Sequence, residues 1–289
     1  MLTYRERKGK VKADKDITRK FHRKDAAPVF ALVGMSLVVL AALWLAVYLY
    51  RSEKEILEYR KIAEMAVYPD GMAEHVAKSA AEGFSQVIGE KNGTDSGTNT
   101  GKSFYDWDAL ERVNEDITGW LCVPGLVDFP VVGAADNQFY LSHGFTGEKS
   151  RFGCPFMDRD TKEDDFNRVI YGHNMGTGSD AMFSVLLKYE DRNYFDENRV
   201  LFYTERYEDV TAYEVIAVVK YNVKELAEWD FRIRNHDNVE ECLAWMERMK
   251  EKALFYREPE DVPDRLITLA TCDRRSFGKD GRFLIVGGI

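Results

Sequence analysis

An uncharged apolar run from Pro28 to Tyr50 limits what this chain can fold into more than any other feature. As a helix these residues would span about 35 Å, enough to cross the roughly 30 Å hydrocarbon core of a bilayer. The alternative is a secretory signal peptide, but its apolar core is usually about 7–15 residues long. No clear small-x-small cleavage site follows Tyr50. We therefore expect an uncleaved transmembrane helix over residues 28–50.

Charge differs sharply on the two sides of this run. Residues 1–27 carry ten Lys or Arg and four acidic residues, whereas the whole chain carries a net charge of −9, so residues 51–289 carry −15. The basic excess before the run predicts a cytoplasmic N-terminus and an extracytoplasmic body, in a single-pass protein of the cell membrane. A basic segment could also bind nucleic acid, but beside an apolar span an orienting role is favoured, and we expect no nucleic-acid partner.

Composition divides the remaining residues into a stalk, a linker and a domain. Apolar residues at near-helical spacing after Arg51 predict a helical juxtamembrane stalk that extends to about Gly89. Residues 89–101 contain no apolar side chain and are rich in Gly, Thr and Asn, which predicts a flexible linker. We therefore expect four parts: residues 1–27, 28–50, 51–102 and 103–289.

Within residues 103–289, hydrophobic periodicity predicts more strands than helices. Apolar residues three or four positions apart predict a short helix that ends near Gly119; they are Trp107, Leu110, Val113 and Ile117. A second helix is predicted over residues 237–252, opened by an Asp/Asn cap candidate at Asp237 and Asn238, with Glu240 three residues after Asp237. Runs of β-branched and aromatic residues predict strands over residues 198–205, 211–221, 265–271 and 282–286. This pattern favours a mostly β barrel or sandwich decorated by helices.

The four cysteines do not indicate a metal site. Cys122, Cys154, Cys242 and Cys272 show no CxxC or zinc-ligand spacing, so no metal is expected. In an extracytoplasmic domain they could form up to two disulfides, and a Cys122–Cys154 pair is one possibility.

Three polar residues stand where predicted strands end or begin. His173 follows the apolar strand of residues 169–172, Cys272 follows residues 266–271, and Arg282 opens the last strand. A thiol attacks an acyl carbon as the thiolate, so a nearby His can exchange the proton. An Arg would stabilise a developing oxyanion. Together the three residue types form a complete acyl-transfer set, although each alone is compatible with a structural role.

The sequence around Cys272 resembles a known family. Residues 268–272, Thr-Leu-Ala-Thr-Cys, match the TLxTC signature of the sortases, the membrane-anchored cysteine transpeptidases of Gram-positive cell surfaces. Arg282 lies ten residues after the Cys, as in that family, and His173 lies within Tyr-Gly-His-Asn-Met at residues 171–175. Further similarity to class B sortases extends over residues 103–289, at residues 119–121, 130–132, 136–141 and 156–158.

This resemblance implies a sortase-type closed β-barrel decorated by helices. It also implies that Cys272 is the nucleophile that forms a thioacyl intermediate with a C-terminal sorting signal, that His173 transfers protons, and that Arg282 binds the substrate backbone and stabilises the oxyanion. No cofactor is required. Positions matching the peptide-binding groove of class B relatives are Asn137, Leu141 and Tyr171, and Asp273 matches an acidic position just after the Cys. The resemblance implies that these four residues bind substrate. The helix over residues 237–252 would belong to the long insertion that precedes the catalytic strand in class B.

The resemblance further implies the partners and leaves the exact reaction open. The partners would be secreted proteins that carry a sorting signal, a peptidoglycan amine or its lipid-linked precursor, and membrane lipid. One alternative is a pilus-type sortase, which joins pilins through a lysine amine. Two others are a catalytically silent, membrane-tethered scaffold on the same fold and a secreted cysteine protease that only hydrolyses.

Overall fold

The structure, a computed structural model, describes residues 4–66, 105–133, 135–176 and 178–289, with side chains from residue 30 onward. The chain divides into two compact units, Met1–Ile56 and Leu57–Ile289. The predicted linker over residues 89–101 lies outside the described residues.

One helix accounts for the described residues of the first unit. Helix α1 runs from Tyr4 to Ala66 without interruption, and its part Phe30–Glu64 is long enough to cross a membrane and contains an 18-residue window with a mean hydropathy of 2.5. The predicted span and the first part of the predicted stalk therefore form one continuous helix. Residues 51–66 contain neither Gly nor Pro, so the sequence contains no helix breaker after the apolar run.

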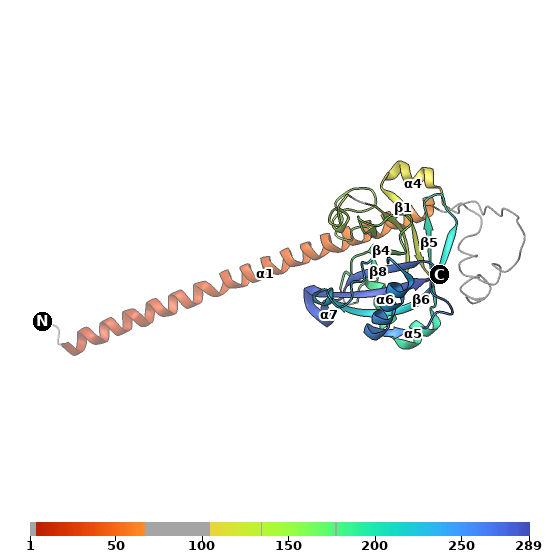
Figure 1. Ribbon diagram of the computed structural model, residues 1–289. Coiled ribbons are helices and arrows are strands. Elements are labelled where there is room, and N and C mark those ends of the chain that lie inside the picture. The colour runs from red at the N-terminus through yellow and green to blue at the C-terminus, as the bar shows by residue number, and fades with distance from the viewer. Residues whose placement is uncertain (1–3, 67–104, 134, 177) are drawn as a thin grey trace, which may run out of the picture. The chain divides into compact units, whose positions relative to one another are not determined.

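The second unit is built around a closed β-barrel (Figure 1). Eight strands follow one another around it in the order β5-β1-β2-β3-β4-β8-β9-β6, and β6 pairs with β5, which closes the barrel. The predicted closed barrel is confirmed, and the alternative of a sandwich is not. Strand β7, Ala253–Tyr256, pairs with β6 outside this ring. The barrel strands are β1 Ile117–Val123, β2 Val127–Val132, β3 Phe156–Met157, β4 Asn167–Tyr171, β5 Val200–Glu205, β6 Val210–Asn222, β8 Leu266–Cys272 and β9 Gly281–Gly288.

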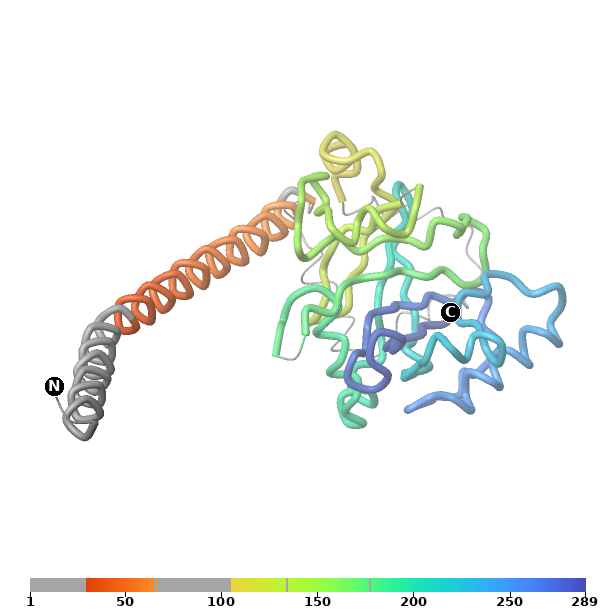
Figure 2. The backbone as a smooth tube through the Cα atoms, turned by 90° about the vertical axis from the view of Figure 1, so that its left-hand side faces the viewer, coloured from red at the N-terminus to blue at the C-terminus, as the bar shows by residue number. Residues whose placement is uncertain are grey.

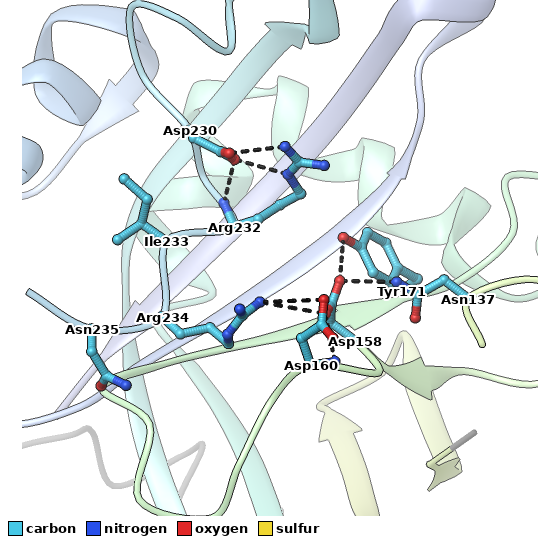
Figure 3. A pocket seen from close by; sticks show the side chains of 9 residues that line it. All are labelled: Asn137, Asp158, Asp160, Tyr171, Asp230, Arg232, Ile233, Arg234 and Asn235. Carbon is cyan, nitrogen blue, oxygen red and sulfur yellow. Dashed lines mark hydrogen bonds and ion pairs between the residues drawn. The ribbon is translucent and has the colours of Figure 1, made fainter. Parts of the chain in front are cut away.

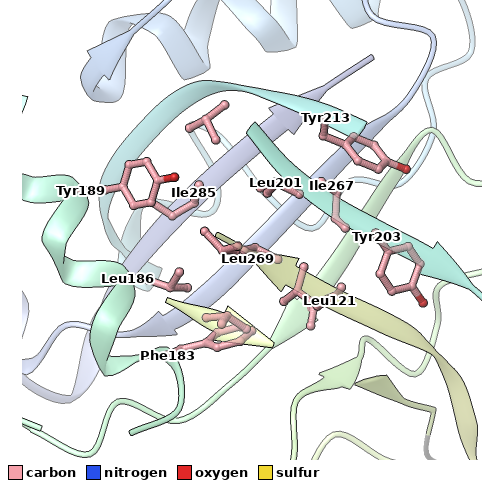
Figure 4. Close-up of a cluster of buried hydrophobic side chains, with 14 of the residues drawn as sticks. Leu121, Phe183, Leu186, Tyr189, Leu201, Tyr203, Tyr213, Ile267, Leu269 and Ile285 are labelled. Atoms are coloured by element: carbon pink, nitrogen blue, oxygen red, sulfur yellow. The ribbon is translucent and has the colours of Figure 1, made fainter. Parts of the chain in front are cut away.

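Alternation along the strands fills the barrel with apolar side chains. In β8, Ile267 and Leu269 belong to the cluster drawn in Figure 4, together with Leu121, Phe183 and other buried residues from across the barrel. Leu266 and Ala270, which flank these two residues on the opposite face of the strand, belong to a different cluster, which α6 residues such as Trp245 cover from outside. Side chains of a strand alternate between its two faces, so Cys272 lies on the outer face with Ala270.

Helices and 3-10 turns occupy the connections between the strands. The α-helices are α4 Trp107–Val113, α5 Arg192–Glu197, α6 Val239–Lys252 and α7 Arg274–Phe277. The 3-10 helices are η2 Phe139–Leu141, η3 Phe183–Glu190, η4 Val223–Glu225 and η5 Gly278–Asp280. The predicted helix over residues 237–252 is α6, which begins two residues later than expected and is capped by Asn238, the second residue of the predicted Asp/Asn pair.

The predicted first helix is shorter than expected. Helix α4 ends at Val113, and the residue that follows, Asn114, donates its backbone N–H to the Leu110 carbonyl. Ile117 continued the helical spacing in the sequence but is the first residue of β1 and pairs with Val132 of β2. Pairing with a neighbouring strand overrides the local helical pattern here.

The end of α1 packs within the second unit, Leu57–Ile289. Tyr59, Ile62 and Ala66 are buried in an apolar cluster that also contains Leu110 of α4. The Ala66 carbonyl accepts a hydrogen bond from the Asp106 backbone N–H at 3.0 Å. A domain boundary near residue 103 therefore omits residues that contribute to the core of this unit.

All four cysteines are free thiols. The possible Cys122–Cys154 disulfide is not formed. Burial raises the pKa of Cys122 to about 12 and also raises the pKa of Cys154 and of Cys242, so these three thiols are neutral at physiological pH.

Candidate active site

Strand register places Cys272 and Arg282 directly opposite each other. Strands β8 and β9 are antiparallel, and Cys272 is the register partner of Arg282 at the end of this pairing. Opposite residues of an antiparallel pair point to the same face, with Cβ atoms about 4.5–5.5 Å apart. Both side chains are partly exposed. The thiol and the guanidinium therefore share the outer face of the barrel at one end of β8.

Strand β4 brings His173 to the same end of the sheet. It runs parallel to β8, with Tyr171 level with Ala270, so His173 and Cys272 each lie two residues beyond a registered pair. In Figures 1 and 2, the green β4 lies beside the blue β8.

Three hydrogen bonds hold the two strand ends together. The Gly172 N–H donates to the Ala270 carbonyl at 3.1 Å, and the Thr271 hydroxyl donates to the Gly172 carbonyl at 2.7 Å. The Asn174 amide donates to the Cys272 carbonyl at 2.7 Å. The fold thus brings together the three residues predicted to catalyse acyl transfer.

One nitrogen of His173 is engaged by the backbone. Its Nε2 lies 2.6 Å from the carbonyl oxygen of Leu141, which can only accept, so Nε2 carries the proton. In neutral imidazole this leaves Nδ1 unprotonated and able to accept a proton. Leu141, predicted to lie in a peptide groove, therefore contacts the candidate site through its backbone carbonyl.

Gly153 leaves room for His173 to approach the Leu141 carbonyl. Gly153 has a φ of +64°, and a Cβ at this position would lie 3.2 Å from His173 Cδ2 and would overlap the Tyr140 carbonyl oxygen. Only a residue without a side chain fits between the imidazole and the segment that contains Tyr140 and Leu141.

A polar pocket of about 610 Å³ contains two of the other predicted residues (Figure 3). The Asp158 carboxylate accepts hydrogen bonds from the Tyr171 hydroxyl at 3.0 Å and from the Asn137 amide at 3.1 Å. Burial and the neighbouring Asp158 raise the pKa of Tyr171, so its phenol is protonated and acts as a donor. The pocket is lined by Asn137, Asp158, Asp160, Tyr171, Asp230, Arg232, Ile233, Arg234 and Asn235.

The opposite wall of the pocket is charged and comes from the segment between η4 and α6. Arg232 forms a two-point contact with Asp230, with N–O distances of 2.9 Å. Arg234 Nη1 lies 3.7 Å from Asp158 Oδ1, and this ion pair connects the segment to the β3–β4 connection. Tyr171 links the pocket to the candidate catalytic residues. It lines the pocket, and its register partner in β8 is Ala270, two residues before Cys272.

Comparison with known proteins identifies the family. No protein-family model matches the chain. Sortase B of Listeria monocytogenes is 33% identical to it over 182 residues, which are 62% of this chain and 71% of that protein. The chain belongs to the sortase B family. The resemblance expected from residues 268–272 is confirmed.

Solved structures agree with this family. The X-ray structure of Clostridium perfringens sortase B matches with 32% identity and a TM-score of 0.57, over 63% of this sortase and 97% of that chain. A Staphylococcus aureus sortase B–substrate complex shares the fold at 24% identity and a TM-score of 0.56, over 63% of this sortase and 83% of that chain.

Arg282 of this sortase keeps an unneutralised charge near Cys272. Its Nη1 donates to the carbonyls of Gly281 at 2.8 Å and Lys279 at 3.1 Å. Among the described residues, no carboxylate lies within ion-pair distance of its guanidinium. Backbone carbonyls orient the side chain and leave its positive charge available to a negatively charged atom.

Asp273 does not reach the pocket. Its side chain is fully buried, and its Oδ1 accepts backbone hydrogen bonds from Arg275 at 3.2 Å and Ser276 at 3.4 Å. These bonds cap the N-terminus of α7 immediately after the candidate nucleophile. The acidic residue expected to contact substrate is thus a helix cap in this sortase.

Several residues of the site had no assigned role in the sequence. Asp158, Arg232 and Arg234 line the pocket, and Asn174 fastens the β4 and β8 ends. Asp158 and Asn174 stand within segments that resemble class B sortases, so their positions carried a usable signal. The segment of Arg232 and Arg234 has no periodicity that would have indicated a pocket wall. In the described part of the chain, no group of three or more His, Cys, Asp or Glu could hold a metal ion.

Proposed function

We propose that this sortase is a membrane-anchored transpeptidase that cleaves the C-terminal sorting signal of secreted proteins and joins them to a peptidoglycan amine. The observation that carries this proposal is the register pair of Cys272 and Arg282, with His173 at the adjacent strand end. Membership in the sortase B family supports the same reaction class.

Cys272 acts as the nucleophile in the first half-reaction. Its thiolate attacks the carbonyl carbon at the cleavage site, and the tetrahedral intermediate collapses to a thioester. Protonated His173 donates a proton from Nδ1 to the departing amine, because Nε2 remains bound to the Leu141 carbonyl. In the second half-reaction Nδ1 takes a proton from the incoming amine, whose attack on the thioester releases the Cys272 thiolate and restores the protonated His173.

Arg282 and the pocket serve binding and charge stabilisation. The unneutralised guanidinium stabilises the oxyanion that forms beside Cys272 and binds the substrate backbone. The pocket that contains Asn137 and Tyr171 holds side chains of the sorting signal, with the Leu141 segment beside it. Asp273 is not included, because its carboxylate caps α7.

The first part of α1 provides the membrane anchor. Within Phe30–Glu64, the apolar part that ends at Tyr50 has the length and composition required of a span. The basic excess over residues 1–27 favours a cytoplasmic N-terminus, with Leu57–Ile289 outside, where wall precursors supply the amine.

The test uses the full chain in detergent micelles with a library of quenched sorting-signal peptides, with and without an oligoglycine or diaminopimelate amine. We expect an amine-linked product from the wild type and from a matched Cys242→Ala control. Cys272→Ala should lose at least about a thousandfold in kcat, since it lacks the nucleophile. Mass spectrometry identifies the product.

Other outcomes would replace the proposal. Cleavage that persists in Cys272→Ala would refute the mechanism. Hydrolysis at the same rate and with the same product, whether or not an amine is present, would indicate a cysteine protease. Failure to trap a thioester with any peptide would indicate a silent scaffold, and a ladder of products in cells would indicate a pilus-type sortase.

A further inference from the structure

Tyr59 of α1 contacts the segment beside His173. Its hydroxyl donates a buried hydrogen bond to the Gly153 carbonyl, and it also interacts with the Cys154 thiol. Its ring packs edge-on against Phe129, with the ring centroids 5.2 Å apart. Only 8% of Tyr59 is exposed. A residue from the helix that contains the candidate membrane span thus binds a loop of the catalytic unit.

This loop is directly connected to His173. The Cys154 N–H donates to the Tyr140 carbonyl at 3.0 Å, and the next residue, Leu141, accepts the hydrogen bond from His173 Nε2 at 2.6 Å. Gly153 also lies against the imidazole, because a Cβ there would be 3.2 Å from Cδ2. Two short routes therefore run from Tyr59 to the imidazole, one through Gly153 and one through Cys154, Tyr140 and Leu141.

We propose that Tyr59 is a positioning residue for His173. Through Gly153, Tyr59 holds the Leu141 carbonyl in place, and this carbonyl orients the imidazole so that Nδ1 faces the reacting groups. The inference rests on the proposed function, in which His173 transfers protons. Proton transfer depends on alignment, and a displacement of about 1 Å can reduce a rate by roughly a hundredfold. Loss of one hydroxyl should therefore change catalysis more than folding.

Two variants of the full-length protein separate positioning from packing. Tyr59→Phe removes the hydroxyl and keeps the ring against Phe129. Ile62→Val, one turn further along α1, trims a side chain buried in the same cluster. For Tyr59→Phe we expect kcat to fall by about tenfold, with KM for the peptide within about twofold and a shifted pH profile of kcat/KM. For Ile62→Val we expect a lower melting temperature with kcat and the pH profile unchanged.

A second measurement needs no substrate. The ¹⁵N shifts of the His173 ring, in full chain labelled at its five histidines and assigned with His173→Gln, report which nitrogen carries the proton. We expect protonation at Nε2 in the wild type and in Ile62→Val, and a mixture of tautomers in Tyr59→Phe.

The outcomes distinguish this proposal from the proposed function. Wild-type kcat and pH profile in Tyr59→Phe, or an unchanged His173 tautomer, would overturn the positioning role. An equal loss of kcat in Tyr59→Phe and Ile62→Val, in proportion to the unfolded fraction, would do the same. If the wild type transfers no peptide, the proposed function fails, while the ring shifts still test the link between Tyr59 and His173.

Discussion

At the scale of single residues, the environment of Cys272 differs from those of the other three cysteines. Burial raises the pKa of Cys122, Cys154 and Cys242, and none of the three follows a strand beside a free cation. Cys272 is partly exposed and stands opposite Arg282. A thiolate is the reactive form of cysteine, so chemical reactivity should follow this difference.

Alkylation by iodoacetamide at pH 8 should therefore modify Cys272 first. A raised pKa keeps a thiol protonated until the pH approaches that pKa, so Cys122, with a pKa of about 12, holds almost no thiolate at pH 8. We expect Cys122 to react at least about 100-fold more slowly than Cys272. Peptide mass spectrometry measures the rates, and all four should react in urea. Faster labelling of Cys122 or Cys154 in the folded protein would contradict this assignment.

At the scale of elements, α6 shows how local capping sets a boundary. Asn238 accepts a hydrogen bond from the Glu241 backbone N–H at 2.9 Å, whereas Asp237, the other cap candidate in the sequence, contributes only its backbone N–H. Both residue types cap helices well, and they are adjacent in the sequence. Only the backbone conformation distinguishes them.

Asn238→Ala should accordingly destabilise the catalytic unit, and Asp237→Ala should not. Loss of an N-cap costs about 1 kcal/mol, which corresponds to a melting temperature lower by roughly 2–4 °C in a unit of this size. Thermal unfolding followed by circular dichroism compares the two variants. A larger effect at Asp237 would show that the helix begins one residue earlier.

At the scale of the whole molecule, the catalytic unit begins within α1. Tyr59, Ile62 and Ala66 share a buried cluster with Trp107, Leu110 and residues of the barrel. A chain cut at residue 103 would expose the apolar surface that these side chains cover. Burying one large apolar side chain stabilises a protein by about 1.5–3 kcal/mol.

A truncated chain of residues 103–289 should therefore melt at a lower temperature than residues 51–289. We expect a difference of about 5 °C or more, because at least two large side chains lose their packing. Residues 57–289 are the matched control and should melt like residues 51–289, since the compact unit begins at Leu57. Calorimetry provides the comparison. Equal melting of all three chains would show that the α1 contacts contribute nothing to stability.

Much of the site was predictable because its residues lie in strong local patterns. Strands β8 and β9 are rich in apolar and β-branched residues. Cys272 is the last residue of β8, and Arg282 is the second residue of β9. The pocket was less predictable. Asn137 and Tyr171 were expected in it, and their partner Asp158 lies in a segment that resembles the family, but the charged wall of Arg232 and Arg234 comes from a segment without periodicity. Asp273 was predicted to contact substrate, and its burial is visible only in the fold.

The sequence by itself determined the apolar span, the β-rich domain and the set of Cys272, His173 and Arg282, because hydropathy, alternation and short signatures are local properties of the chain. Only the tertiary structure decided that Ile117 joins a strand, that Asp273 caps α7, and that Tyr59 reaches the loop beside His173. These outcomes depend on contacts between residues far apart in the chain. Tyr59 and Gly153 are 94 positions apart, and no local pattern records which distant groups will meet when the barrel closes.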